Sequence, residues 1–330
     1  MTIFSRNYLG MPIDDWLINE TARAARELVF YHVSLSKAGA ETVSRTFWVV
    51  YCLEKEICFT DGRPSTIADE DIGCAVPKSP EPHFGHFDWL VTYARLARIL
   101  TKTYASLFSV SATLQSREEY YQAIDSRRAE LEQWKASLPQ EFQPEHPIPA
   151  SHKSTLGSLQ IALRIRLSYY NLVAVLSRLT IHVGSGERQA KSLDTLVSTA
   201  RSIVDLSIHI NQESYMPTWM LSSMPLAALF ILFDFTVHNP THPDTSLNLK
   251  LLDIASGYFS RLDLASGGAF PCGMLAEFTH IARQHVHSAQ SEKPQAQVST
   301  PNTDMSPAHW GDWRPPLGMN DPRALEVCLL

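Results

Sequence analysis

The sequence predicts an all-α protein: an irregular multi-helix domain of about nine helices, with no sheet. Apolar residues recur at helical spacing through most of residues 13–287, and no stretch alternates polar and apolar residues over the length of a strand. Signals built from glycine and proline end the periodic stretches. Hydrophobic residues make up 45% of the 330 residues and charged residues 19%, a composition that can bury a sizeable core.

The N-terminal part of the chain predicts two helices. Leu17, Ala24 and Leu28 share one face of a first helix, which we expect to end near Gly39. A second helix is expected over residues 42–59. Its middle is apolar on almost every side, which is typical of a central, buried helix.

The next helix boundaries have specific signals. Gly62 can close the second helix in the left-handed conformation, and Pro64 cannot continue it. Asp88 is expected to cap a third helix. Ser116 and Glu119 have the spacing of a capping box, which predicts the start of a fourth helix.

Residues 220–237 are apolar and about as long as a short membrane-spanning helix. Pro225 and Asp234 interrupt the segment, and a charge inside a membrane is costly. No lysine or arginine flanks it closely, so a topology signal is missing. We therefore interpret the segment as a buried core helix.

These patterns predict the organisation of the whole chain. We expect one all-α domain over residues 1–287, with a Pro-rich linker or ordered loop at about residues 139–153, and a disordered Pro-rich tail over residues 288–330. Trp310, Asp312 and Trp313 give the tail the composition of a short partner-binding segment. A disordered tail without such a role is the alternative.

The sequence contains none of the motifs by which common catalytic sites are found. It has no GxGxxG or GxxxxGK[ST] phosphate loop, no GxSxG nucleophile elbow and no HExxH. We predict no catalytic, cofactor-binding or metal-binding residues. His238 and His242 are interpreted as parts of a polar loop, and Asp88, near His83 and His86, as a helix cap.

Charge and cysteine content argue against a nucleic-acid-binding protein, a disulfide-stabilised protein and a zinc module. The net charge is −6 and the pI is near 6.1, whereas a nucleic-acid binder usually has a basic face. The five cysteines are widely spaced and form no CxxC pair, so neither a disulfide framework nor a zinc module is indicated.

One stretch, residues 45–77, resembles a known family. It reads RTFWVVYCLEKEICFTDGRPSTIADEDIGCAVP and is similar to the signature of the fungal-specific transcription factor domain, the middle homology region of binuclear zinc-cluster transcription factors. Where the family usually has an Asp-Arg pair, this chain has Glu54-Lys55. The matching positions that we take as candidate site residues are Arg45, Phe47, Trp48, Tyr51, Gly62, Arg63, Pro64, Asp69 and Asp71.

The resemblance implies a regulatory function. It implies a transcription regulator in the nucleus, whose domain senses an effector or binds proteins of the transcription machinery or a DNA-binding regulator. DNA is then reached only indirectly, and no membrane is involved. The family's zinc belongs to a DNA-binding module that this sequence does not contain, so no cofactor is expected in this chain. The family domain usually starts earlier, so we expect the domain to be N-terminally incomplete.

Other interpretations stay open at this stage. The chain is alternatively an all-α enzyme with an unrecognised site, or a decayed or truncated regulator without independent activity. The signature itself has two interpretations. Phe47, Trp48 and Tyr51 lie within about one helical turn and can anchor the core, and the planar guanidinium of Arg63 suits Asp69 or Asp71. The favoured interpretation is therefore architectural, and an effector pocket between helices is the alternative.

Overall fold

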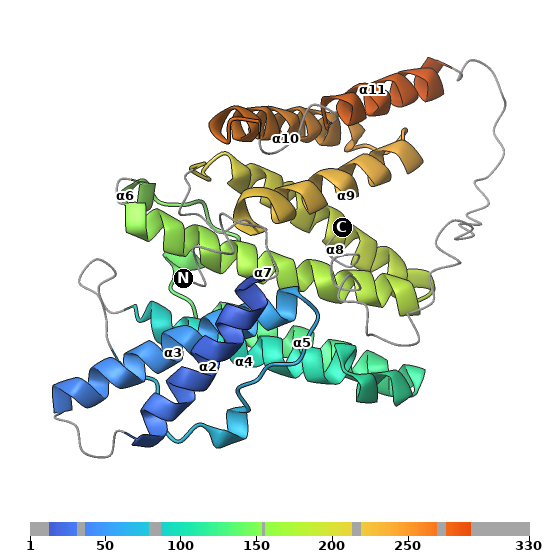
Figure 1. Ribbon diagram of the computed structural model, residues 1–330. Helices are drawn as coiled ribbons and strands as arrows, with labels where there is room; N and C mark the ends of the chain where they lie inside the picture. Colours follow the sequence, from blue (N-terminus) through green and yellow to red (C-terminus); the bar gives the residue numbers. More distant parts are fainter. Residues whose placement is uncertain are drawn as a thin grey trace. The chain divides into compact units, whose positions relative to one another are not determined.

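The computed structural model describes residues 13–31, 37–78, 87–153, 156–212, 219–268 and 275–291 (Figure 1). These residues form helices and turns and contain no strand, which confirms the all-α prediction. The described residues divide into two compact units, one up to Leu172 and one from Val173, and α7 (Leu156–Val183) contributes to both.

The first unit is built on α3. Its helices are α2 (Ile13–Tyr31), α3 (Lys37–Thr60), α4 (Trp89–Thr103), α5 (Arg117–Ala136), the short α6 (Ala150–Lys153) and the first part of α7. α3 packs against α2 on one side and α4 on the other, and α4 also packs against α5. As predicted, the middle of α3 is the buried centre of this unit, and Trp48 and Tyr51 are fully buried.

The first helix differs from the prediction. Its buried residues are Ile18, Ala22 and Ala25, whereas Leu28 is 40% exposed. Gly39 does not end this helix but lies in the first turn of α3. The predicted face was wrong because one apolar spacing fits two neighbouring faces of a short helix, and packing against α3 selects between them.

The predicted helix boundaries at Gly62, Asp88 and Ser116 are confirmed. Gly62 has a φ of 66°, and the amides of Gly62 and Arg63 donate to carbonyls of the last turn of α3. The carboxylate of Asp88 accepts the amide of Val91 at 3.1 Å. Ser116 and Glu119 form the complete capping box at the start of α5.

The Pro-rich segment after α5 is an ordered loop. It contains the short 3₁₀ turn η5 (Gln140–Phe142), and Phe142 is fully buried. The ring of Phe142 stacks on Phe87 at 4.2 Å between centroids. The hydroxyl of Tyr170 donates to the carbonyl of Pro144, so α7 holds this loop in place.

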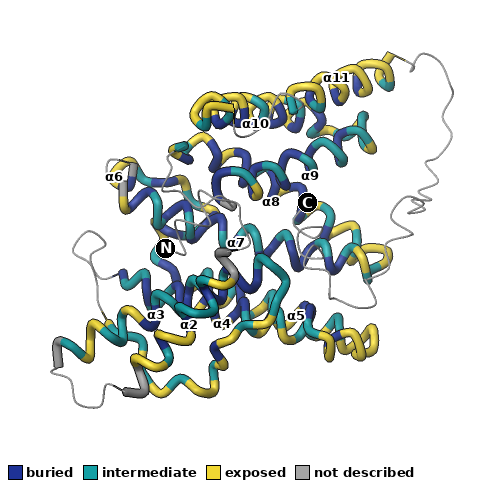
Figure 2. The backbone as a smooth tube through the Cα atoms, viewed as in Figure 1, coloured by how far each residue is buried: buried dark blue, intermediate teal, exposed yellow. Residues whose placement is uncertain are grey.

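The second unit surrounds α9. Besides the end of α7 it contains α8 (Gly186–Ser207), the π-helical turn η6 (Trp219–Ser223), α9 (Met224–His238), α10 (Thr245–Ala265) and α11 (Leu275–Ser291). α9 packs against α8, α10 and α11 (Figure 1). Figure 2 shows α10 and α11 buried along one side and exposed along the other.

One described helix, Met220–His238, is long and apolar enough to cross a membrane by length and composition. Of its most apolar window, 61% is buried inside the protein. This burial supports the interpretation as a core helix.

Two further predictions concern the C-terminal region. α11 continues to Ser291, four residues beyond the predicted boundary at residue 287. The predicted disordered tail otherwise lies outside the described residues, as do His83 and His86. The single domain over residues 1–287 stays a prediction.

Candidate functional site

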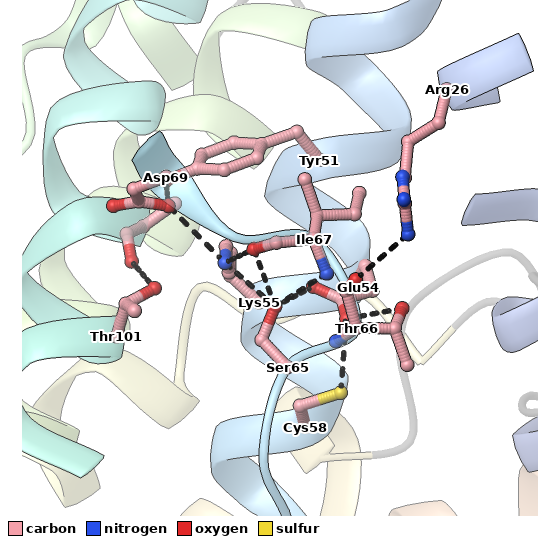
Figure 3. Close-up of polar contacts among 11 residues, drawn as sticks. Arg26, Tyr51, Glu54, Lys55, Cys58, Ser65, Thr66, Ile67, Asp69 and Thr101 are labelled. Atoms are coloured by element: carbon pink, nitrogen blue, oxygen red, sulfur yellow. Dashed lines mark hydrogen bonds and ion pairs between the residues drawn. The ribbon is translucent and has the colours of Figure 1, made fainter. Parts of the chain in front are cut away.

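The candidate site is the family signature, which consists of the second half of α3 and the loop that follows it. The loop spans residues 61–78 and includes the 3₁₀ turn η1 (Asp69–Asp71). It folds back along α3, so that residues up to 31 positions apart in sequence are in contact. Figure 3 shows the polar contacts that join the two segments.

Three aromatic residues of α3 anchor this arrangement. The rings of Trp48 and Tyr51 meet edge to face at 4.9 Å between centroids, and Phe47 contacts both. The indole of Trp48 donates to the carbonyl of Ala75 at 3.0 Å, and the hydroxyl of Tyr51 donates to Asp69 at 2.8 Å. Each ring is therefore a core residue whose polar atom holds the loop, as expected for buried tryptophan and tyrosine.

Glu54 is the main acceptor of the site and is fully buried. Its carboxylate accepts the Ser65 hydroxyl at 2.8 Å, the Thr66 amide at 2.6 Å and the Thr66 hydroxyl at 3.0 Å. The thiol of Cys58, one turn along α3, donates to the same carboxylate at 3.5 Å. Burial of a carboxylate is tolerated because its oxygens are hydrogen-bonded.

Lys55 is the complementary donor, with only 2% of its surface exposed. Its ammonium donates to the Ser65 hydroxyl at 2.6 Å and to the carbonyl of Ile67, and it pairs with Asp69 at 3.2 Å. It also lies 5.0 Å from the centre of the Tyr51 ring. Figure 3 shows Glu54 and Lys55 reaching the same loop from neighbouring positions on α3. We call Glu54, Lys55, Ser65, Thr66 and Asp69 the loop clamp.

The predicted pairing of Arg63 with Asp69 or Asp71 is wrong. Asp69 pairs with Lys55, and the guanidinium of Arg63 lies 3.3 Å from Asp61. Lys55 is favoured because it projects from the helix beneath the loop, whereas Arg63 leaves the helix end next to Asp61. Asp71 is exposed.

Two other candidate residues lie at the edge of the site. Pro64 is exposed, and Arg45 lies with its guanidinium 6.0 Å from the centre of the Trp89 ring. The nine predicted residues thus share one segment of the structure. Of these nine residues, Tyr51 donates to Asp69, and Asp69 pairs with Lys55.

A second polar network joins α3 to α7. Arg164 pairs with Glu56 at 2.6 Å, and its Nε donates to the Tyr93 hydroxyl at 2.9 Å. The hydroxyl of Tyr93 also donates to Glu56 at 3.1 Å and lies 2.9 Å from that of Ser168. The consecutive charged residues Glu54, Lys55 and Glu56 of α3 therefore all form hydrogen bonds or ion pairs within the first unit.

Burial shifts the pKa of the groups around these networks. It raises the pKa of the Cys52 thiol to about 12 and that of the Tyr51 hydroxyl well above its usual range, with a further contribution from the Asp69 bond. Burial lowers the pKa of Arg164, but the charges of Glu56 and Tyr93 and the hydrogen bonds to both together offset this and raise the pKa overall. These residues therefore hold fixed charge states near neutral pH and are poor candidates for acid–base chemistry.

The cavity beside the signature is small, and a larger hollow lies at the Pro-rich loop. A partly open cavity of about 20 Å³ has Lys55, Cys58, Phe59, Ser65, Thr101 and Tyr104 among its lining residues. That volume holds roughly one water molecule, whereas small-molecule sites are usually about 300–1,000 Å³. A larger hollow of about 450 Å³ is open to solvent and is lined by Pro139, Glu141, His146 and neighbouring prolines.

Within the described ranges, no three His, Cys, Asp or Glu side chains are grouped so that they could hold a metal ion. His238 lies beside Asp234 at 3.2 Å on α9, one turn apart. His242 packs on the ring of Phe235 and accepts the amide of Asp244. Both histidines have structural contacts here.

The sequence did not predict the residues that form most of the polar contacts between α3 and the loop. Glu54 and Lys55 were noticed only as the family's acidic–basic pair, and Ser65 and Thr66 were not singled out. The available signal was two adjacent opposite charges inside an otherwise apolar helix, since a buried charge requires a partner.

Comparisons with known proteins agree with this description. Residues 17–136 match the family described as "Fungal specific transcription factor domain". An "ABC-transporter-regulating transcription factor" of Aspergillus oryzae is 29% identical over 289 residues, and one of Aspergillus fumigatus is 28% identical. Each alignment covers 78% of this chain and 32% of the relative, so the chain spans about a third of their length.

A third relative is also named as a transcription factor, but for a different set of genes. The "Fusaridione A cluster transcription factor fsdR" of Fusarium heterosporum is 25% identical over 282 residues, which cover 76% of this chain and 51% of that protein. No solved structure matches the chain significantly. The family and these relatives are transcription regulators, and residues 17–136 of this chain are similar to the fungal specific transcription factor domain.

Proposed function

We propose that this chain is the regulatory part of a fungal transcription regulator and acts through protein contacts rather than through chemistry of its own. The match of residues 17–136 to the transcription factor domain carries this proposal. The named relatives have the same general role, although the chain spans only about a third of the Aspergillus proteins.

The site favours an architectural role for the signature over an effector pocket. Glu54 accepts the amide of Thr66, and Lys55 donates to Ser65 and pairs with Asp69. Their polar atoms are therefore bound to other groups of the protein. The cavity beside Lys55 and Ser65, about 20 Å³, is too small for a metabolite. The contacts of the signature therefore fix the loop on α3, and we expect other proteins to recognise the surface that this rigid arrangement forms.

The enzyme alternative has little support in the site. A catalytic acid or base needs a pKa near the working pH and access to a substrate. In the signature, Lys55 is instead buried and paired with Asp69, and Glu56 is paired with Arg164 of α7. We propose that the chain has no enzymatic activity.

We further propose that the chain works in the nucleus and reaches DNA through a partner. A net charge of −6 does not favour direct binding to the DNA backbone. The five cysteines of this sequence lack the close pairing that a zinc cluster needs. The expected partners are a DNA-binding regulator and proteins of the transcription machinery.

A reporter experiment tests the regulatory function. The full chain is fused to an unrelated DNA-binding domain in a fungal host, and transcription from a promoter with the matching sites is measured. We expect at least about a threefold change relative to that DNA-binding domain alone, comparable to a stabilisation of about 0.7 kcal/mol in a promoter-bound complex. A fluorescent fusion reports nuclear accumulation in the same cells.

Variants make the experiment specific. Lys55→Met breaks the loop clamp and should remove the reporter response, whereas Lys102→Met alters only a surface pair with Glu130. Immunoblotting must show similar amounts of both fusions. A well-expressed wild-type fusion in the nucleus without any reporter response would contradict the proposal.

A further inference from the structure

The starting observation is the exposed face of α4. The exposed residues of this helix are Arg95, Arg98 and Lys102, and all of them are basic. They follow one another at spacings of three and four residues, so they lie on one face of the helix. The helix contains no acidic residue that could offset them. A soluble surface usually mixes both signs of charge, so a helix face with one sign alone suggests a contact.

Two of these cations have no ion-pair partner in the described part of the chain. Lys102 pairs with Glu130 of α5, and Glu130 also pairs with Arg127 at 2.9 Å. No carboxylate among the described residues pairs with Arg95 or Arg98. Like charges three residues apart repel each other and weaken a helix slightly. The fold carries this cost without compensation, which points to a partner outside the chain.

Arg98 is already oriented for such a contact. Its guanidinium lies 5.4 Å from the centre of the Trp48 ring, and Trp48 is fully buried. An arginine that stacks on a fixed ring loses little conformational freedom when it binds, and its donors suit a carboxylate bidentately. Arg95 lies about one turn away on the same exposed face.

We propose that Arg95 and Arg98 bind two carboxylates of an acidic helix from a partner protein. Charge complementarity selects an acidic partner. The spacing favours a helix, because Arg95 and Arg98 are about 4.5 Å apart along the axis of α4. Carboxylates three or four residues apart on a partner helix are about 4.5–6 Å apart, whereas those on one face of a strand are about 6.8 Å apart.

A nucleic acid fits this face less well than an acidic helix does. The net charge of the chain is −6, and binding to a phosphate backbone depends on several cations together. An acidic turn also lies nearby: Trp48, beneath Arg98, meets Tyr51 edge to face, and Tyr51 donates to Asp69 of η1. A long polyanion is repelled by this turn, whereas a short helix needs only the two arginines.

Binding of a defined peptide to the full chain tests the proposal. The probe is a fluorescein-labelled, alanine-based helix of about 18 residues with glutamates along one face, and the comparison peptide has glutamine at those positions. At about 25 mM salt we expect the glutamate peptide to bind with a Kd below about 0.5 mM, and the glutamine peptide at least about tenfold more weakly. Fluorescence anisotropy measures both. At about 150 mM salt the difference should shrink, because exposed ion pairs are screened.

Variants assign the binding to the two arginines. Arg95→Gln/Arg98→Gln should weaken binding of the glutamate peptide about tenfold, which is about 1.4 kcal/mol. The matched control, Arg188→Gln/Lys191→Gln, removes two exposed cations with the same spacing from α8 and should change the affinity less than about twofold. Arg95→Gln alone leaves Arg98 on the Trp48 ring and should cost about threefold. Circular dichroism verifies that each variant is folded.

Three results would overturn the proposal. The first is an absence of glutamate-peptide binding at about 0.5 mM protein, or an equal loss in the α8 control. The second is binding of a random duplex with a Kd below about 1 µM that Arg95→Gln/Arg98→Gln abolishes, which would make the face a nucleic-acid site. The third is a wild-type dimer that the same variant turns into a monomer in sedimentation velocity, which would make the occupant a second copy.

A regulatory role for this contact rests on the proposed function. The peptide experiment does not depend on that role, because it measures binding by the isolated protein. A silent reporter together with intact peptide binding would therefore count against the proposed function and leave the contact standing.

Discussion

At the scale of single residues, the signature depends on two adjacent, oppositely charged side chains that are both removed from water. Burial of an unpaired charge costs several kcal/mol, so such residues persist only where partners surround them. Glu54 has three donors in the loop and Lys55 has two acceptors and a carboxylate. The pair therefore specifies how the loop lies on α3.

Loss of the negative charge should loosen the loop. For Glu54→Gln we expect a loss of about 2 kcal/mol in the free energy of unfolding, because hydrogen bonds to a charged acceptor are replaced by neutral ones. Glu70→Gln is the matched control, since Glu70 lies on the same loop and is exposed. Urea unfolding followed by circular dichroism measures both, and an unchanged midpoint for Glu54→Gln would refute this role.

Cys52 predicts a particular dependence on alkaline pH. Its pKa is raised to about 12 in the folded protein, chiefly by burial, whereas an unfolded thiol titrates near 8.5. Between these values the unfolded chain releases a proton that the folded chain keeps, so the free energy of unfolding falls as pH rises. The stability contribution is fully present below about pH 8.5.

The variant Cys52→Ala removes this titration. Between pH 8.5 and pH 10, we expect its stability relative to wild type to improve by about 1–2 kcal/mol, at up to about 1.4 kcal/mol per pH unit. Unfolding is measured at both pH values in reducing buffer. Parallel pH dependences for the two proteins would show that the Cys52 thiol ionises normally in the folded state.

At the scale of elements, the sequence predicted where helices begin and end better than it predicted which helix face is buried. The start of α5 followed from Ser116 and Glu119, and the end of α3 from Gly62, because each signal acts on backbone groups within a few residues. The face of α2 did not follow, since it depends on contacts with α3. Local interactions can be read from a short window, and long-range packing cannot.

The capping box allows a clean test at this scale. Ser116→Ala should lower the free energy of unfolding by about 1 kcal/mol through loss of the cap. Ser126→Ala, at an exposed position within the same helix, should have almost no effect or a slightly stabilising one. Thermal unfolding of the two variants under identical conditions compares them, and equal midpoints would argue against the cap as a source of stability.

At the scale of the whole molecule, the described chain consists of two all-α units with separate centres. In the first, α3 is the buried core helix, and in the second it is α9. Both helices are apolar on most sides, which is why they were recognised as central from composition alone.

The overall charge predicts weak contact with nucleic acid. At 150 mM salt we expect the full chain to bind a random 30-base-pair duplex with a Kd above about 100 µM, at the weak end of non-specific binding. Fluorescence anisotropy at 50 and 150 mM salt measures this. Saturable binding below about 1 µM with a steep salt dependence would reveal a basic surface that the net charge of −6 conceals.

The sequence by itself determined the fold class, most helix boundaries, the burial of α3 and α9 and the family signature. These properties depend on periodicity, on end signals and on residue order, which are all local. Tertiary structure decided which cation pairs with Asp69: Lys55 of α3 does, rather than Arg63, which is nearer in the sequence. It also decided which face of α2 is buried and that the cavity beside Lys55 is water-sized. These outcomes depend on distances between segments far apart in sequence, and such distances exist only once the chain has packed.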